Sequence, residues 1–308
     1  MNKPSFTGNN RQAGRRKFIA NSLLTAGALL TAPSITRAAG IHTTSETYTV
    51  GDIMDLFIKE VPGGQVTNTV DTLKAGNRDI QVTGIVTTMF ATIEVIRKSV
   101  ELGANFIIAH EPTFYNHADD TSWLQDDHVY QYKANLLKQH NMAVWRNHDH
   151  IHSLRPDGVT AGVLEKLQWT EYAGHDSLNN ITVPATTLKD LISHLKAKLS
   201  IEKVRYIGDL AQSCSHLLLM PGAAGGRRQI EAISKTKPDV LVCGEILEWE
   251  TAEYVRDARA KGDNISLVVL GHIASEEPGS EFMLHWLKKK VPSIKSTHIT
   301  PGNSLAFM

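Results

Sequence analysis

The stretch Asn105-Phe-Ile-Ile-Ala-His110-Glu111 decides the fold, because a short apolar run leads directly into two side chains that can bind metal ions. An apolar run of this length, bounded by polar residues, is typical of a strand buried on both faces. Before it, residues 80–87 have the pattern of another strand, and residues 91–102 have the spacing of an amphipathic helix. This strand–helix–strand unit predicts a parallel sheet covered by helices.

The same order of elements recurs along the rest of the chain. Further strands are expected at 142–145, 214–220, 239–243 and 265–270. Further helices are expected at 50–61, 127–140, 162–167, 188–199, 229–235, 250–260 and 280–290. The sequence therefore predicts an α/β fold with mixed or mainly parallel sheets covered by helices, as one large domain or as two intertwined lobes.

Side chains of the types that bind metal ions follow three of the expected strands. His110 and Glu111 follow the first, a histidine-rich segment follows residues 142–145, and His272 and Glu276 follow residues 265–270. Open α/β sheets place their sites at the carboxyl ends of strands. Five or more ligands at one edge predict a metal centre with more than one ion. His110 and Glu111 reach the same centre only if the chain bends after the strand, which Pro112 favours.

The histidine-rich segment runs Asn147-His148-Asp149-His150-Ile151-His152. If this segment is extended, the three imidazoles line one face and repel each other when protonated. A metal ion or an acidic partner relieves that repulsion, which favours a metal site here. The alternative interpretation is a solvated loop that happens to be rich in histidine.

His272 and Glu276 stand four residues apart, directly after a very apolar run. Pro278 suits the first turn of the helix expected at 280–290. Glu276 could turn back toward His272, or it could cap that helix. Glu245 holds a similar position after residues 239–243, so it is a candidate either to bind a metal ion or to orient a ligand.

The N-terminal segment has the pattern of an export signal. Arg15 and Arg16 precede a moderately apolar stretch, and a cleavage region of small residues follows it near Ala39. We expect residues 1–39 to be a twin-arginine signal peptide, which predicts a periplasmic or otherwise exported protein with no stable membrane insertion after cleavage. A general secretory signal and an ordinary apolar helix are the alternatives.

Charge and cysteine content narrow the possible partners. Removal of residues 1–39 takes away six Lys and Arg and leaves 26 basic against 32 acidic side chains, a formal charge of −6. The chain has no basic stripe, so nucleic-acid binding is not expected. Cys214 and Cys243 both lie in or beside apolar runs, which favours buried thiols over a disulfide. The glycine-rich loop 222–226 favours a tight turn, with an anion site as the alternative.

Four segments together resemble the Nif-three-like dinuclear metal-centre family, which includes the homologs of GTP cyclohydrolase I type 2. They are residues 84–114, 148–167, 240–245 and 271–279, and they occur in the family's order. The motif Gly271-His-Ile-Ala-Ser-Glu-Glu-Pro-Gly279 is the most specific of them. The resemblance implies a fold of two intertwined lobes over residues 40–308, two bound divalent metal ions and assembly as a toroidal homohexamer.

The chain departs from the family pattern at two positions. The family has a His-His pair at a strand end, a later His-Thr-x-x-Asp segment and a C-terminal His-x-x-x-Glu. Here Glu111 stands in the pair and His152 stands at the Asp position, so an imidazole and a carboxylate have exchanged places. The resemblance implies the following metal ligands, with His150 as the alternative to His152: His110, Glu111, His152, His272 and Glu276.

The ligand types and the resemblance suggest a function. Mixed imidazole and carboxylate ligands suit Zn²⁺, Mn²⁺, Fe²⁺ or Ni²⁺. Two adjacent ions would acidify a bridging water to a hydroxide, which predicts a metal-dependent hydrolase of a small-molecule substrate. Glu245, His148 or His150 would carry the proton. The alternatives are a metal carrier without catalysis and a ring-forming scaffold.

Overall fold

The computed structural model describes residues 47–306 and 308, which form one compact unit with two five-stranded sheets. The first sheet has the strand order β1-β4-β3-β2-β10 and the second has the order β5-β7-β8-β9-β6. The twin-arginine segment predicted at residues 1–39 lies outside the described residues. Within the described part of the chain, no helix is both long and apolar enough to cross a membrane.

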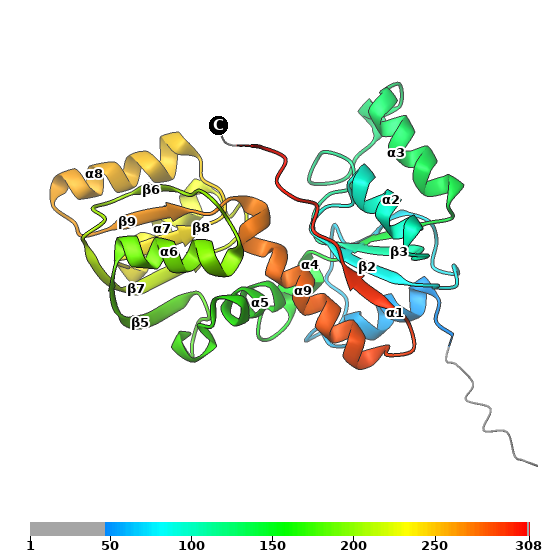
Figure 1. Cartoon of the computed structure of the whole chain (residues 1–308), viewed down its shortest axis with the longest axis horizontal. Helices are drawn as coiled ribbons and strands as arrows, with labels where there is room; N and C mark the ends of the chain where they lie inside the picture. Colours follow the sequence, from blue (N-terminus) through cyan, green and yellow to red (C-terminus); the bar gives the residue numbers. More distant parts are fainter. Residues whose placement is uncertain (1–46, 307) are drawn as a thin grey trace, which may run out of the picture. The chain divides into compact units, whose positions relative to one another are not determined.

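The first sheet is built from both ends of the described chain. Its central strands run parallel and every residue of β2, β3 and β4 is buried, while β1 joins β4 in antiparallel orientation. The last strand, β10, returns to this sheet after the whole second sheet and pairs with β2 (Figure 1). The strands are β1 Leu73–Ala75, β2 Ile85–Thr88, β3 Phe106–Ala109, β4 Ala143–Arg146 and β10 Ser296–His298.

The second sheet has three parallel strands at its centre and an antiparallel strand at each edge. Pro184 lies in the edge strand β5, where the pairing with β7 shifts between Thr182 and Thr186. A proline without an N–H group is tolerated at such an edge irregularity. The strands are β5 Asn180–Thr187, β6 Arg205–Ile207, β7 Ser213–Met220, β8 Val240–Cys243 and β9 Ser266–Val269.

Helices cover both sheets, as the apolar patterns predicted. They are α1 Val50–Ile58, α2 Ile93–Glu101, α3 His128–Gln139, α4 Asp149–Ser153, α5 Gly158–Leu167, α6 Leu188–Leu199, α7 Gly226–Thr236, α8 Glu253–Lys261 and α9 His272–Lys290. Shorter helical turns occupy Ser122–Leu124, Thr170–Tyr172 and the π-helical segment Glu248–Ala252. In Figure 1, α2 and α3 lie beside the first sheet, and α7 and α8 lie beside the second.

Three apolar clusters follow from the alternation of side chains along the strands. Ile85 and Phe106 face a shared core that also receives residues of the second sheet, whereas Val86 and Ile107 face α2 and α3. The third cluster lies between the second sheet and α7 and α8. Strands buried on both faces explain why the sequence shows continuous apolar runs there instead of an alternation with polar residues.

The prediction of mixed sheets covered by helices is confirmed, and so is the prediction of two buried free thiols at Cys214 and Cys243. Four strands that the sequence pattern did not reveal are β1, β5, β6 and β10. Each of them carries partly exposed or polar residues, so it lacks the apolar run of a central strand.

The start predicted for the last helix is wrong. Helix α9 begins at His272, eight residues before the predicted start at 280, and Pro278 lies inside it instead of in its first turn. The helix packs closely on α5, because a Cβ atom on Gly162 would come within 2.4 Å of the Pro278 carbonyl oxygen. The early start places His272 and Glu276 one helical turn apart on the same face.

Candidate metal centre

Three segments of the chain meet at one cluster of imidazoles and carboxylates. His110 and Glu111 lie in the bend after β3, His152 lies on α4, and His272 and Glu276 lie on the first turns of α9. His272 Nε2 is 3.0 Å from both Glu111 Oε1 and Glu276 Oε2, and His152 Nε2 is 4.0 Å from Glu276 Oε1. The structure therefore brings together all five residues predicted as metal ligands, and the chain bends after β3 as expected.

Helix α4 corrects the prediction that His148, His150 and His152 line one face of an extended segment. His148 caps this short helix and His152 lies one turn later, so these two imidazoles share a face, and their ring centroids are 4.9 Å apart. His150 points elsewhere: it is fully buried, and its Nδ1 lies 2.7 Å from Asp71 Oδ2. His152, and not His150, is therefore the residue of this segment that lies beside Glu276.

Asp71 explains why the segment folds as a helix. One oxygen of its carboxylate accepts hydrogen bonds from the N–H groups of His148 and Asp149, at 2.8 and 3.0 Å, and the other accepts one from the N–H of His150 at 2.8 Å. These N–H groups are the donors that a helix start leaves without partners. The capping residue lies 77 positions before His148, so no local sequence pattern could have revealed it.

The four imidazoles of the cluster share one orientation. In each ring Nδ1 bonds outward to a fixed acceptor, and Nε2 faces the cluster. The acceptors are the Asn147 carbonyl for His110, Asp149 for His148, Asp157 for His152 and Glu245 for His272, at 3.3, 2.9, 2.9 and 2.9 Å. An outward hydrogen bond of this kind fixes the tautomer and leaves the other nitrogen free to bind a metal ion.

The Nε2 atom of His110 is a buried polar atom whose hydrogen-bonding capacity no described residue uses. It is buried and has no hydrogen-bond partner among the described residues, although Glu276 Oε2 lies 3.4 Å away. A buried nitrogen without a partner carries a desolvation cost of about 1–3 kcal/mol. Because Nδ1 is already committed to the Asn147 carbonyl, an ion at Nε2 would remove this cost.

Negative charge accumulates around His272. Glu111, Glu245 and Glu276 all bond to its ring. Burial lowers the pKa of His272, but these three carboxylates outweigh it and raise the pKa to about 12. Burial likewise raises the pKa of Glu276, but contacts with His110 and His272 outweigh it and hold that pKa well below its usual range. The three carboxylates thus stabilise a positive charge at the His272 ring, which a bound metal ion would supply in place of the proton.

The two imidazoles of α4 differ in their protonation. Burial and the neighbouring His110 lower the pKa of His148. Burial also lowers the pKa of His152, but its hydrogen bond to Asp157 and the charge of Glu276 outweigh this and raise the pKa. His148 therefore favours the neutral form, which is the form that binds metal ions.

A buried arginine holds the second oxygen of Glu111. Arg146, at the end of β4, is fully buried, and its Nη2 lies 3.2 Å from Glu111 Oε2. Its other nitrogens donate to the carbonyls of His110 and His117. Glu111 Oε2 is thus committed to Arg146, and Oε1 is the oxygen that faces the imidazoles.

The glycine-rich loop after β7 forms a tight turn, as its sequence favoured, and it also closes over Glu276. Gly222 adopts a positive φ of 66°, and a Cβ atom at this position would lie 2.2 Å from Glu276 Oε1. The Gly222 N–H donates a hydrogen bond to Ser275 Oγ at 3.0 Å. The turn therefore packs directly against the Glu276 carboxylate and restricts its position.

Two overlapping groups of residues in the described chain have the spacing needed for an ion. The first is His110, His148 and His152, and the second is His110, Glu111 and Glu276, with ligand atoms within 4.8 Å of one another in each group. Ligands about 2.0–2.3 Å from a common ion are separated by distances below this limit. His148, predicted as a proton carrier, therefore lies in a ligand position.

One side of the cluster remains accessible. The side chains of His272, His148 and His152 are 19, 23 and 29% exposed, whereas His110 and Glu276 are only 4 and 6% exposed. Glu245, at 54% exposed, stands at the solvent side and bonds to His272. The cluster therefore has buried members on one side and partly exposed members on the other.

The residues that orient the candidate ligands were not among those predicted from the sequence. Asp149 and Asp157 stand next to or near the histidines, and a helix-capping pattern at Asp157-Gly158 could have marked the second of them. Arg146 looked like the polar end of a strand. Only the fold reveals that it faces Glu111.

Comparison with known proteins identifies a matching family and proteins of similar sequence or fold. The family model described as Duf34/NIF3 (NGG1p interacting factor 3) matches residues 65–301. A GTP cyclohydrolase 1 type 2 homolog from Clostridium acetobutylicum is 24% identical over 217 residues, which cover 67% of this chain and 76% of that protein. The crystal structure of a hypothetical protein from Staphylococcus aureus superimposes with a TM-score of 0.70 at 20% identity and covers 85% of this chain and all of that one. A NIF3-related protein from Bacillus cereus reaches a TM-score of 0.66 at 15% identity, covering 85% of this chain and 99% of that chain.

Proposed function

Because the chain belongs to the Duf34/NIF3 family, we propose that its cluster of imidazoles and carboxylates binds two divalent metal ions and hydrolyses a small-molecule substrate. The observation that carries the proposal is the shared orientation of the four imidazoles. Each holds its Nδ1 in an outward hydrogen bond, so that four Nε2 atoms converge with two carboxylates. Such an arrangement is costly without cations, and it is typical of protein metal sites.

The ligands we assign are the five predicted ones together with His148. His110 is common to both groups of ligand atoms, and Glu111 offers Oε1 alone because Arg146 holds Oε2. Two divalent ions, when bound here, would supply Lewis acidity that lowers the pKa of water and polarises a carbonyl or phosphoryl group. Zn²⁺, Mn²⁺, Fe²⁺ and Ni²⁺ all suit this mixture of nitrogen and oxygen ligands.

Glu245 is the residue we assign to proton transfer. It is the most exposed carboxylate of the cluster, and only one of its oxygens is needed to orient His272. Its pKa is lowered, first by the hydrogen bond from His272, so the carboxylate is ionised at neutral pH and its second oxygen is available to take a proton. His150, the other proton carrier considered from the sequence, is buried against Asp71 and has no access to the cluster.

The test is elemental analysis of the folded protein, combined with a panel of phosphoester, carboxylic ester, cyclic amide and nucleotide substrates that includes GTP. We expect about two ions per chain, a marked loss of metal in His110→Ala and His272→Ala, and unchanged metal in the matched surface variant His140→Ala. Fewer than one ion per chain, or a metal content unaffected by the two cluster variants, would falsify the dinuclear site.

The same experiment separates catalysis from metal binding alone. Turnover that requires metal and falls strongly in Glu245→Gln, without loss of metal, supports the hydrolase. Full metal content with no turnover on any member of the panel would instead favour a metal carrier or a scaffold with structural metal. The accessible edge of the cluster supports catalysis, because a purely structural site is closed by protein ligands.

We further propose that the protein is exported by the twin-arginine route and assembles as a homohexamer. The signal pattern at residues 1–39 supports the first statement, and the family resemblance supports the second. Cell fractionation of a tagged chain should place it in the periplasm, and Arg15→Lys/Arg16→Lys should retain it in the cytoplasm. Light scattering should give a mass of six chains, and a stable monomer would contradict the assembly.

A further inference from the structure

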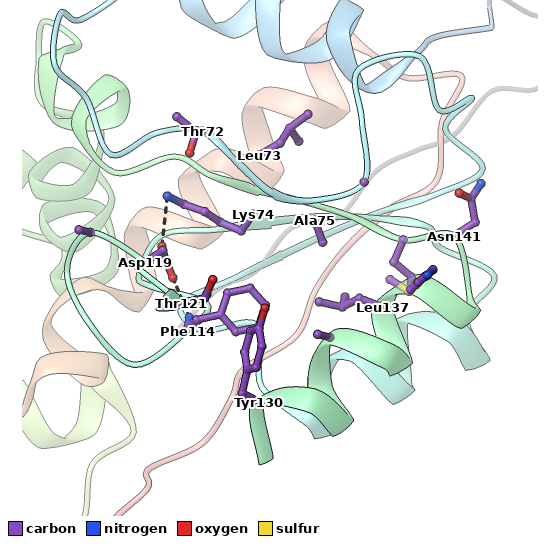
Figure 2. Close-up of a pocket in the computed structure, with 15 residues that line it drawn as sticks. Thr72, Leu73, Lys74, Ala75, Phe114, Asp119, Thr121, Tyr130, Leu137 and Asn141 are labelled. Carbon is purple, nitrogen blue, oxygen red and sulfur yellow. Dashed lines mark hydrogen bonds and ion pairs between the residues drawn. The ribbon is translucent and has the colours of Figure 1, made fainter. Parts of the chain in front are cut away.

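A second cavity lies on the first sheet, away from the metal-binding cluster. It has a volume of about 480 Å³ and is bounded by β1, by the loop 114–121 and by α3 (Figure 2). This volume falls within the range of about 300–1,000 Å³ that is usual for small-molecule sites. None of the residues assigned to the metal ions lines it.

The cavity contains a buried ammonium group. Lys74, in β1, has a side chain only 6% exposed, and its Nζ lies 3.2 Å from Asp119 Oδ2 (Figure 2). This is its single ion pair among the residues that the structure describes. Burying a lysine is unfavourable unless its charge is well compensated, so the quality of this one contact matters.

Asp119 compensates Lys74 poorly. Its Oδ1 accepts the Phe114 N–H at 2.7 Å, and its Oδ2 is shared between Lys74 and the buried Arg146 at 3.2 and 3.7 Å. Neither contact is aligned as a hydrogen bond, because Oδ2 has no hydrogen-bond partner. One carboxylate thus faces two buried cations, and the Lys74 ammonium keeps donors available toward the cavity.

The remaining walls are suited to an apolar body. Phe114, Leu137 and Met142 are buried and line the cavity, and the ring of Tyr130 stands beside them (Figure 2). Polar side chains line the rest of the cavity, among them Thr121, Lys138 and Asn141. A cavity that combines this apolar wall with a buried, undersatisfied cation suits a ligand that joins one anionic group to an apolar portion.

We propose that this cavity binds a small organic carboxylate, with its anionic group on Lys74 and an apolar or aromatic body against Phe114, Leu137 and Met142. The carboxylate supplies the hydrogen-bond acceptors that Asp119 does not. Binding at this cavity does not depend on the metal-dependent activity of the cluster, so the two functions are tested separately.

Phenylacetate is the first probe, and isothermal titration of the metal-loaded protein is the measurement. Benzyl alcohol is the neutral control with the same ring, and inorganic phosphate is the anionic control without an apolar body. We expect phenylacetate to bind at least about tenfold more tightly than either control, a difference worth about 1.4 kcal/mol. Equal binding of benzyl alcohol or of phosphate would contradict the assigned ligand class.

Two variants of the cavity test whether phenylacetate binds there. Lys74→Met removes the cation, and Ala134→Phe fills the cavity from α3 while it leaves Lys74 in place. Both should weaken phenylacetate binding by at least about tenfold, whereas Lys203→Met, a change far from the cavity lining, should not. Two variants that act by different means keep the test decisive if one of them folds poorly.

His272→Ala distinguishes the cavity from the metal centre, since a carboxylate could also bind there. Phenylacetate affinity that survives in His272→Ala and falls in Lys74→Met supports the cavity. The reverse result would overturn the cavity and leave the proposed metal site intact. If the protein binds fewer than one metal ion per chain but binds phenylacetate normally, the proposed metal site is wrong and the cavity proposal stands.

Discussion

At the scale of single residues, the candidate centre depends on residues that no metal-binding motif contains. Gly222 is the clearest case, because it combines a positive φ with direct contact on the Glu276 carboxylate. Gly225, in the same turn, also has a positive φ of 85° but has no atom within 4 Å of a Cβ position. Substituting each glycine in turn therefore distinguishes the effect of a positive φ from the effect of a contact with Glu276.

We predict that Gly222→Ala lowers metal affinity by about 10- to 100-fold, the range found when a group that orients a ligand is lost. The added methyl group would displace Glu276 from its contacts with His110 and His272. Gly225→Ala also places a side chain at a positive φ, but without a contact on Glu276, and should bind metal almost as the unchanged protein does. Competition with a metal-sensitive dye measures both, and equal affinities for the two variants would contradict the prediction.

Lys133 gives the protein a pH-dependent stability. Burial lowers its pKa from 10.5 to about 8, partly opposed by Asp119, and its Nζ donates to the Thr113 carbonyl at 2.6 Å. Between these two pH values the folded protein has released this proton and the unfolded chain has not. The unfolded chain then binds more protons, so the free energy of unfolding rises with pH in this window.

We predict that Lys133 contributes an increase of up to about 3 kcal/mol in the free energy of unfolding between pH 8 and pH 10.5. Lys133→Met should lose this rise, while Lys138→Met, an exposed lysine on the same helix, should keep it. Urea unfolding at several pH values provides the measurement. If the free energy of unfolding depends on pH in the same way in the unchanged protein and in Lys133→Met, burial does not lower the pKa of Lys133.

Five of the six proposed ligands could be named from the sequence, because imidazoles and carboxylates after apolar runs are local signals. The residues around them could not, since Asp71 and Arg146 act across 77 and 35 positions. A carboxylate in a loop and an arginine at a strand end resemble ordinary surface residues until the fold places them. For the same reason, the cation in the cavity beside α3 had no signature in the sequence.

At the scale of elements, two helices decide the geometry of the centre. The short helix α4 turns His150 away and brings His148 and His152 to one face. The early start of α9 puts His272 and Glu276 on its first turns. In both cases a periodic apolar pattern was absent, because the first turns are dominated by residues of the site. Central strands and helices such as α6, by contrast, follow their apolar patterns closely.

The contact between α5 and α9 supports that early start, and it gives a prediction for stability. Gly162→Ala places a methyl group against the backbone of Pro278, which cannot move without shifting α9. We expect a loss of about 1–3 kcal/mol in the free energy of unfolding, as is usual for overpacking. Glu165→Ala, an exposed position on the same helix, is the control and should have little effect. Thermal and urea unfolding measure the difference, and an unchanged stability would mean that the two helices are not in this contact.

At the scale of the whole molecule, the centre joins the two sheets. Glu111 and His152 belong to the first sheet and its connections, whereas α9, which carries His272 and Glu276, follows the last central strand of the second. Metal ions bound by ligands from both sides would add to the shared apolar core that already connects the sheets. Metal binding and folding are therefore expected to be linked.

We predict that chelation lowers the melting temperature of the metal-loaded protein. Free metal at 100 times its dissociation constant contributes about 2.7 kcal/mol to the folded state. Adding Zn²⁺ or Mn²⁺ back should restore the stability, and His272→Ala should be insensitive to both treatments. Calorimetry with and without a chelator measures the effect. A chelator that leaves the melting temperature unchanged would separate the ions from the stability of the fold.

The two-sheet architecture was predictable in outline, since the apolar runs of β2, β3, β4, β7, β8 and β9 each gave a strand. The edges of the sheets were not, because β1 and β10 are three residues long and carry polar side chains. The strand order depends on partners far apart in the chain. The pairing of β10 with β2 joins residues more than 200 positions apart, beyond the reach of any local pattern.

This return of β10 to the first sheet has a consequence for the newborn chain. While a ribosome makes the protein, β2 emerges early but keeps an open edge until residues 296–298 have been translated. His272 and Glu276 also emerge late, so a nascent chain holds no complete set of ligands until nearly the last tenth of the message has been read. A chain that ends near residue 260 would have an unpaired strand and would lack two of the six proposed ligands, His272 and Glu276. Only a chain that has been translated through residue 298 can therefore complete both the first sheet and the set of proposed ligands.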